Sequence, residues 1–218
     1  MKENTGIFIL IVLYFVGTLA MLLPSIRPMV LPLSSFTLFC SFLVLLQSYR
    51  WKKEIVLASA LVFIVGFGAE WVGVTSGKLF GNYWYGNNLG TKLFGVPLII
   101  GINWAMLSLL CSTISVRWIK HPFIQLLAAA AIMTGLDWIM EPVAIKNDFW
   151  HWKNNHIPLF NFVCWFGISC ITNWVYISIA KPKVNKTSLA LFLLITLFFT
   201  IQFIDRKSTR LNSSHLVI

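Results

Sequence analysis

The chain has 218 residues, of which 58% are hydrophobic and 11% are charged, and its mean hydropathy is +0.79. A soluble domain carries about 25% charged residues, so this composition excludes a soluble globular protein and indicates an integral membrane protein. The formal charge of +10 suggests a nucleic-acid partner, but most basic residues lie in short clusters between apolar runs. Clusters of this kind report membrane topology, so we expect contact with membrane lipid and none with nucleic acid.

Seven apolar runs organise residues 1–204 into one predicted transmembrane domain. Each run is near the ~20 residues that a helix needs to cross the hydrocarbon core, and the alternation of a membrane β-barrel is absent. We therefore expect an all-α polytopic membrane helix bundle of about seven transmembrane helices. The runs are Gly6–Leu23, Met29–Gln47, Ile55–Trp71, Val96–Val116, Pro122–Met140, Leu159–Ile179 and Ser188–Ile204.

Lysine and arginine are distributed unequally between the two sides of these runs. A cytoplasmic N-terminus places nine of them inside and five outside, which favours this orientation in the inner (cytoplasmic) membrane. The inner set is Lys2, Arg50, Lys52, Lys53, Arg117, Lys120, Lys181, Lys183 and Lys186, and the outer set is Arg27, Lys78, Lys92, Lys146 and Lys153.

The last stretch, Asp205–Ile218, changes abruptly to polar residues after Ile204. Its start, D-R-K-S-T-R-L-N-S-S-H, resembles the in-frame translation of a sequencing-library adapter. We expect a non-native, disordered tail and exclude it from the fold and from the function.

The stretch Glu70–Trp104 is unusual for a loop between membrane helices. It holds five glycines between Gly73 and Gly90, together with the aromatic residues Phe80, Tyr83, Trp84 and Tyr85. Glycines permit close backbone approach and aromatic rings supply stiff contact area, so we predict an ordered lid or pocket wall. The alternative is an interfacial aromatic belt with flexible turns.

Three acidic residues lie at the ends of apolar runs on the predicted outer side, namely Glu70, Asp137 and Glu141. Asp137 and Glu141 are four residues apart and share one helix face, and Pro142 is expected to end that helix. Ionisable residues in membrane spans are costly, so these three are the candidate catalytic residues.

Amide and aromatic side chains are expected to complete a pocket around these carboxyl groups. Asn103 and Asn161 begin the fourth and sixth runs on the same side and can hold a water molecule. Tryptophan faces can stabilise a cation. The predicted substrate-binding residues are Asn103, Trp104, Tyr83, Tyr85, Asn161, Trp165 and Trp138.

Two histidines, His151 and His156, follow in the next loop on that side. Their spacing to the acidic residues matches no metal-ligand motif. The glycine-rich loop follows a membrane helix and not the strand that a dinucleotide site needs. We predict neither a metal nor any other cofactor.

These residues together resemble the membrane carotenoid-biosynthesis proteins that include bisanhydrobacterioruberin hydratase and the bacterial carotenoid 1,2-hydratases. The resemblance covers about Ile55–Ile179. The matching pieces are Glu70-x-x-Gly73-x-x-x-Gly77, Phe80-Gly81-x-Tyr83-x-Tyr85, Leu89-Gly90, Gly95-Val96-Pro97, Trp104, Asp137-x-x-x-Glu141-Pro142, Trp150-x-Trp152 and Pro158-x-x-Asn161-x-x-x-Trp165.

The resemblance implies a hydro-lyase that adds water across the terminal double bond of an acyclic carotenoid end group, giving a tertiary alcohol. It also implies a lipophilic carotenoid substrate and an association with other carotenoid enzymes. The chemistry of hydration, and not the resemblance, assigns the roles. Asp137, a full turn inside Glu141, is expected to donate the proton, and Glu141 is expected to stay ionised and hold the water. Glu70 is expected either to support the cation or to position the glycine-aromatic loop.

Two other functions remain open. Carotenoid end-group cyclisation begins with the same protonation but must exclude water. A carotenoid-binding or transport protein without turnover would distribute charges along a path through the bilayer, whereas here they cluster at one end. A retinal protein is disfavoured because Ser188–Ile204 contains no lysine for a Schiff base.

Overall fold

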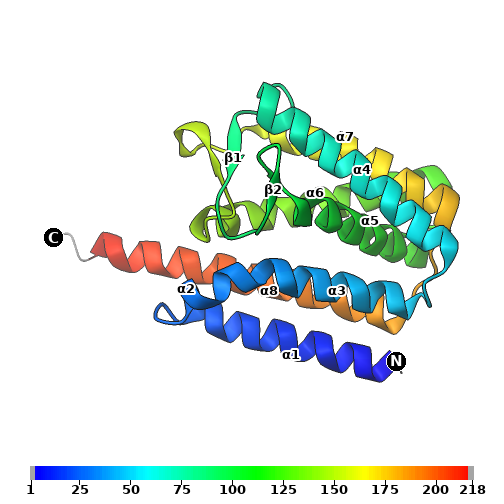
Figure 1. Ribbon diagram of the computed structural model, residues 1–218, viewed down its shortest axis with the longest axis horizontal. Helices are drawn as coiled ribbons and strands as arrows, with labels where there is room; N and C mark the ends of the chain where they lie inside the picture. The colour runs from blue at the N-terminus through cyan, green and yellow to red at the C-terminus, as the bar shows by residue number, and fades with distance from the viewer. Residues whose placement is uncertain (1–2, 216–218) are drawn as a thin grey trace.

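The computed structural model describes residues 3–215, with side chains described through Asp205 (Figure 1). Within this part of the chain, seven helical spans are long and apolar enough to cross a membrane, which confirms the predicted all-α bundle. The protein is therefore a multi-pass membrane protein. The spans are α1 (Glu3–Leu22), α2 to α3 (Arg27–Ser48), α4 (Lys53–Ser76), α5 (Leu98–Trp118), α6 (Pro122–Lys146), α7 with its terminal π turn (Leu159–Ala180) and the first part of α8 (Lys186–His215).

The second span is built from three consecutive helical pieces. They are α2 (Arg27–Val30), the 3₁₀ turn η1 (Leu31–Leu33) and α3 (Ser34–Ser48). Pro28 and Pro32 each lie in the first two positions of a piece, where the missing N–H of proline removes no helical hydrogen bond.

The helices form two groups (Figure 1). The first group contains α1, α3 and α8, which pack against one another, and the second contains α4, α5, α6 and α7. Contacts of α5 with α3 and of α6 with α8 join the two groups. The π turn η3 (Tyr176–Ala180) follows α7 (Leu159–Val175) and ends the sixth span.

Helix α6 continues through Pro142 to Lys146, so the prediction that Pro142 ends the helix is wrong. Proline keeps a helical φ, and here the packed helix accommodates the missing N–H and the bulk of the ring. The helix closes a turn later, where Asn147 N donates to Val143 O at 3.1 Å and Phe149 N donates to Ala144 O at 3.0 Å. Both acidic residues of α6 therefore lie inside the helix.

Two short β-ribbons cover the end of the second helix group. Strand β1 (Tyr83–Tyr85) pairs antiparallel with β4 (Trp150–Trp152), and β2 (Lys92–Leu93) pairs with β3 (Val96–Pro97). The short 3₁₀ turn η2 (Lys153–Asn155) follows β4. The loop after Glu70 is thus ordered, as the glycines and aromatic residues predict.

Helix α8 extends past the predicted end of the native fold. Its backbone is helical through His215, because each further residue adds one hydrogen bond to a helix that already exists. The disorder expected from Asp205 onward stays a prediction, and residues 216–218 lie outside the described part. Asp205 Oδ2 accepts a 2.6 Å bond from Lys146 Nζ of α6. The first residue of the adapter-like stretch therefore contacts the bundle.

Candidate active site

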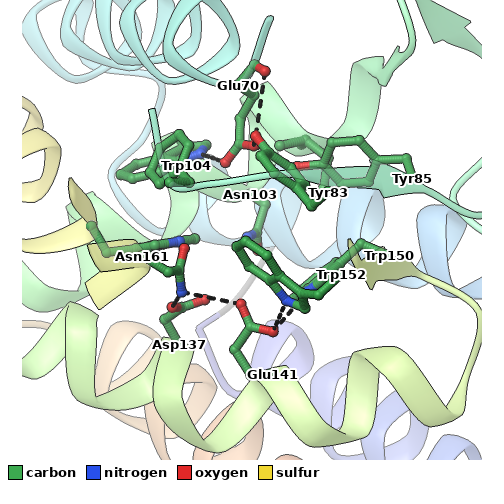
Figure 2. A pocket seen from close by; sticks show the side chains of 13 residues that line it. Glu70, Tyr83, Tyr85, Asn103, Trp104, Asp137, Glu141, Trp150, Trp152 and Asn161 are labelled. Atoms are coloured by element: carbon green, nitrogen blue, oxygen red, sulfur yellow. Dashed lines mark hydrogen bonds between the residues drawn. The ribbon is translucent and has the colours of Figure 1, made fainter. Parts of the chain in front are cut away.

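The three candidate catalytic acids line one pocket. Glu70 comes from α4, and Asp137 and Glu141 come from α6 on the opposite wall (Figure 2). All three are buried, with at most 3% of their surface exposed. The cavity between them has about 20 Å³ of open space, which is room for about one water molecule.

Glu70 is held by three donors. Its Oε2 accepts bonds from Tyr83 Oη at 2.6 Å and Tyr85 Oη at 2.7 Å, and its Oε1 accepts one from Trp104 Nε1 at 3.0 Å. Side chains alternate along a strand, so β1 turns both tyrosines inward and exposes Trp84. Burial, reinforced by the charge of Glu70, raises the pKa of both phenols, which therefore stay protonated donors.

Gly73 and Gly77 allow the loop to reach Glu70. A Cβ at Gly73 would lie 2.6 Å from Tyr83 Oη and 2.8 Å from Phe80 Cδ2, so only glycine admits this close approach. Gly77 ends α4 with φ of 63°, in the left-handed region that favours glycine at a helix C-terminus. The spacing Glu70-x-x-Gly73-x-x-x-Gly77 therefore has a steric cause.

The α6 carboxyl groups are held by tryptophan and asparagine. Glu141 Oε2 accepts bonds from Trp150 Nε1 at 2.9 Å and Trp152 Nε1 at 2.7 Å. Asn161 Nδ2 bridges the two carboxyl groups, at 3.2 Å from Glu141 Oε1 and 3.1 Å from Asp137 Oδ2 (Figure 2). Asp137 Oδ1 is buried and has no hydrogen-bond partner among the described residues.

Aromatic rings close the remaining walls. Trp104 and Trp165 stack with ring centroids 4.2 Å apart and an angle of 16° between their planes. Both rings line the pocket, together with the residues that donate hydrogen bonds to the carboxyl groups. The full lining is Glu70, Phe80, Tyr83, Tyr85, Ile100, Asn103, Trp104, Asp137, Glu141, Trp150, Trp152, Asn161 and Trp165.

A second, larger cavity adjoins this pocket. It has about 380 Å³ of open space, and its walls come from α1, the second span, α5, α6 and α8. Its lining is mostly apolar, and it shares Ile100, Asn103 and Trp150 with the acidic pocket. The acidic pocket thus lies beside a hydrocarbon-lined space.

Six of the seven predicted substrate-binding residues line the acidic pocket, and Trp138 does not. Trp138 is 61% exposed and packs on Phe203 of α8, with centroids 6.4 Å apart. One helical step rotates a side chain by about 100°, so the neighbour of Asp137 faces away from the pocket. The structure therefore does not bring Trp138 to the acidic pocket.

The sequence interpretation missed Trp150 and Trp152 as site residues. The pattern Trp-x-Trp could have identified them, because alternate residues of a strand point to the same face. His151, between them, turns outward and stacks on Trp84. Its Nε2 lies 2.6 Å from Asp148 Oδ1, and this bond lowers the pKa of the Asp148 carboxyl group.

The fold and the pocket define a class of protein: a seven-span membrane protein with a buried acidic pocket beside an apolar cavity. Residues 11–209 match the model of the carotenoid biosynthesis protein family, and the chain belongs to this family. This confirms the resemblance seen in the sequence and extends it to α1 and α8. The protein thus has a role in carotenoid biosynthesis. Comparisons with curated proteins and with solved structures gave no match.

Proposed function

We propose that the protein is a carotenoid hydratase that adds water to the terminal double bond of an acyclic carotenoid end group. The observation that carries this proposal is the arrangement of three buried carboxyl groups around space for one water, beside an apolar cavity. Hydration of a trisubstituted alkene needs an acid and a water. It changes no oxidation state overall and so requires no redox cofactor.

The hydrogen bonds support Asp137 as the proton donor. Glu70 and Glu141 each accept three bonds from N–H or O–H groups, an arrangement that stabilises a carboxylate. Asp137 accepts one, which leaves its Oδ1 available to carry a proton beside the cavity. This donor count replaces the difference in depth inferred from the sequence, because Asp137 and Glu141 are almost equally buried.

The reaction then follows in two steps. Asp137 protonates the less substituted alkene carbon, and the π electrons form the new C–H bond, leaving a tertiary cation. The water oxygen bonds to this cation, and its released proton passes to Glu141 and returns to Asp137. The Glu70 carboxylate and the stacked rings of Trp104 and Trp165 stabilise the positive charge.

Expression in a host that makes the acyclic carotenoid lycopene tests the proposal. We expect extracted pigment to gain the mass of one water per modified end, with the oxygen taken from isotope-labelled water. A product with the mass of lycopene but cyclic ends would identify a cyclase. Unchanged lycopene, with folded protein present in the membrane, would favour a binding or transport protein.

We also propose that the N-terminus is cytoplasmic and that the acidic pocket lies at the outer side of the inner membrane. The nine-to-five distribution of basic residues supports this orientation. Single cysteines at the exposed positions Lys78 and Lys153, in a variant without the native cysteines, should react with an impermeant thiol reagent from outside. Reaction only from the cytoplasmic side would contradict the orientation.

A further inference from the structure

The larger cavity is elongated along the helices. Its wall on α1 runs from Val12 to Met21, nine residue steps that correspond to about 14 Å at the helical rise. This is about half of the ~30 Å hydrocarbon core. Asn103 and Trp150 belong to both cavities, so the elongated space adjoins the pocket that holds the carboxyl groups.

Exposure of the lining residues locates an opening. Val16 on α1 is 57% exposed, and Phe36 on α3 is 61% exposed, although both line the cavity. On the other walls, Met106, Leu107 and Ile195 are buried, with at most 3% exposed. The cavity is therefore closed towards α5 and α8 and open between α1 and α3.

Small side chains on α1 contribute to this opening. Gly17 and Ala20 both line the cavity on α1. A Cβ added at Gly17 would meet no atom within 4 Å, so the space beside it is empty of protein. In a membrane-spanning bundle, an apolar opening of this kind faces lipid chains and admits a hydrocarbon from the side.

We propose that the larger cavity is a polyene channel with a lateral portal between α1 and α3 at Gly17. This inference rests on the proposed function, since the acyclic carotenoid is its committed occupant. The shared residues Asn103 and Trp150 place one end group at the carboxyl groups. The adjoining half of the polyene fills the channel, and the far half stays in the bilayer.

A channel that spans only about half of the hydrocarbon core has a consequence for the products. Only one end group reaches the acidic pocket in each binding event. A carotenoid with two identical ends must therefore leave and bind again before the second end reacts. The singly hydrated carotenoid should therefore precede the doubly hydrated one during a time course.

Binding is tested separately from catalysis in an Asp137→Asn background. Gly17→Leu is added to fill the portal, and Gly167→Leu is its matched control. Gly167 is exposed on α7, lines neither cavity and also has no atom within 4 Å of an added Cβ. The measurement is lycopene retained per folded protein after purification, by absorbance, with bound lipids identified by mass spectrometry.

We expect Gly17→Leu to lower lycopene retention about tenfold, with Gly167→Leu unchanged. Equal retention in the two variants, no retention in Asp137→Asn itself, or phospholipid as the sole occupant would overturn the channel. If Gly17→Leu does not fold, lycopene retention is measured instead in Ala20→Leu, which fills the same portal, and the same expectation applies. Selective loss of lycopene without any hydration by the wild type would reject the proposed function and keep the channel. If Gly17→Leu alone, with Asp137 present, leaves hydration unchanged, the channel is rejected and the proposed function is kept.

Discussion

Two sets of polar side chains are buried within the group of helices α4 to α7, and they differ in whether all their polar atoms find hydrogen-bond partners. The first is the acidic pocket. The second, the inner polar layer, is formed by Ser108 and Ser112 of α5 with Thr172 and Asn173 of α7. Ser108 Oγ donates to Thr172 Oγ1 at 2.9 Å, and Ser112 Oγ donates to Asn173 Oδ1 at 2.7 Å.

The inner polar layer is neutral and self-satisfied, which is how hydroxyl and amide groups join helices in a membrane. The acidic pocket instead holds three carboxyl groups, no lysine or arginine in its lining, and the unpartnered Asp137 Oδ1. Ionisable side chains are costly in a bilayer, which makes such an arrangement a candidate functional site. The contrast supports our proposal that the acidic pocket carries the chemistry, whereas the inner polar layer joins helices.

The largest expected effect is on catalysis in the acidic pocket. Asp137→Asn keeps the shape of the side chain but cannot protonate an alkene, so turnover should fall about 10²–10⁴-fold while the protein still folds. The measurement is hydroxylated carotenoid per amount of membrane-inserted protein, with Glu141→Gln and Glu70→Gln alongside. Near-normal turnover in the Asp137 variant would reject its assignment as donor, and near-normal turnover in all three would reject the acid mechanism.

The inner polar layer should respond in the opposite manner. Asn173→Ala removes the acceptor of Ser112 and a 2.8 Å bond to Ser169 O, and should lower the free energy of unfolding by about 1 kcal/mol. Turnover per folded protein should not change. Unfolding in detergent and product formation are measured on the same sample, and a selective loss of turnover would remove the distinction between the layers.

A smaller effect is expected at the edge of the lid. The Asp148 pKa is lowered by the bond from His151, so the ionised carboxylate stabilises the fold above its unfolded pKa of about 3.9. This contribution is lost as pH falls through the lower, folded pKa. Because Asp148 is 45% exposed, it amounts to less than about 1 kcal/mol. Unfolding of wild type and Asp148→Asn should therefore converge in acid and differ slightly near neutrality; parallel curves at every pH would contradict this.

The smallest effect is expected outside both layers. Deleting residues 206–218 keeps the Lys146–Asp205 ion pair and removes only the segment that resembles an adapter. Thermal unfolding and turnover should match those of the full chain. A large loss of folded protein would show that the end of α8 supports the bundle.

The span count and part of the site were predictable from local rules. A bilayer requires about 20 apolar residues per helix, so hydropathy alone located seven spans. The helical period put Asp137 and Glu141 on one face, and the same period, applied to Trp138, would have excluded it from the pocket. Pro142 was misread because a proline marks a helix end by propensity, whereas the packed helix tolerates it.

The sequence by itself determined the membrane class, the acidic residues and the glycine-aromatic lid, because each depends on composition or on short spacing. Only the tertiary structure decided that Trp150 and Trp152 hold Glu141 and that Tyr83 and Tyr85 hold Glu70. These bonds depend on the pairing of β1 with β4, strands more than sixty residues apart. The apolar cavity is likewise absent from any local pattern. Its walls come from helices at both ends of the chain, and empty space exists only once those helices pack.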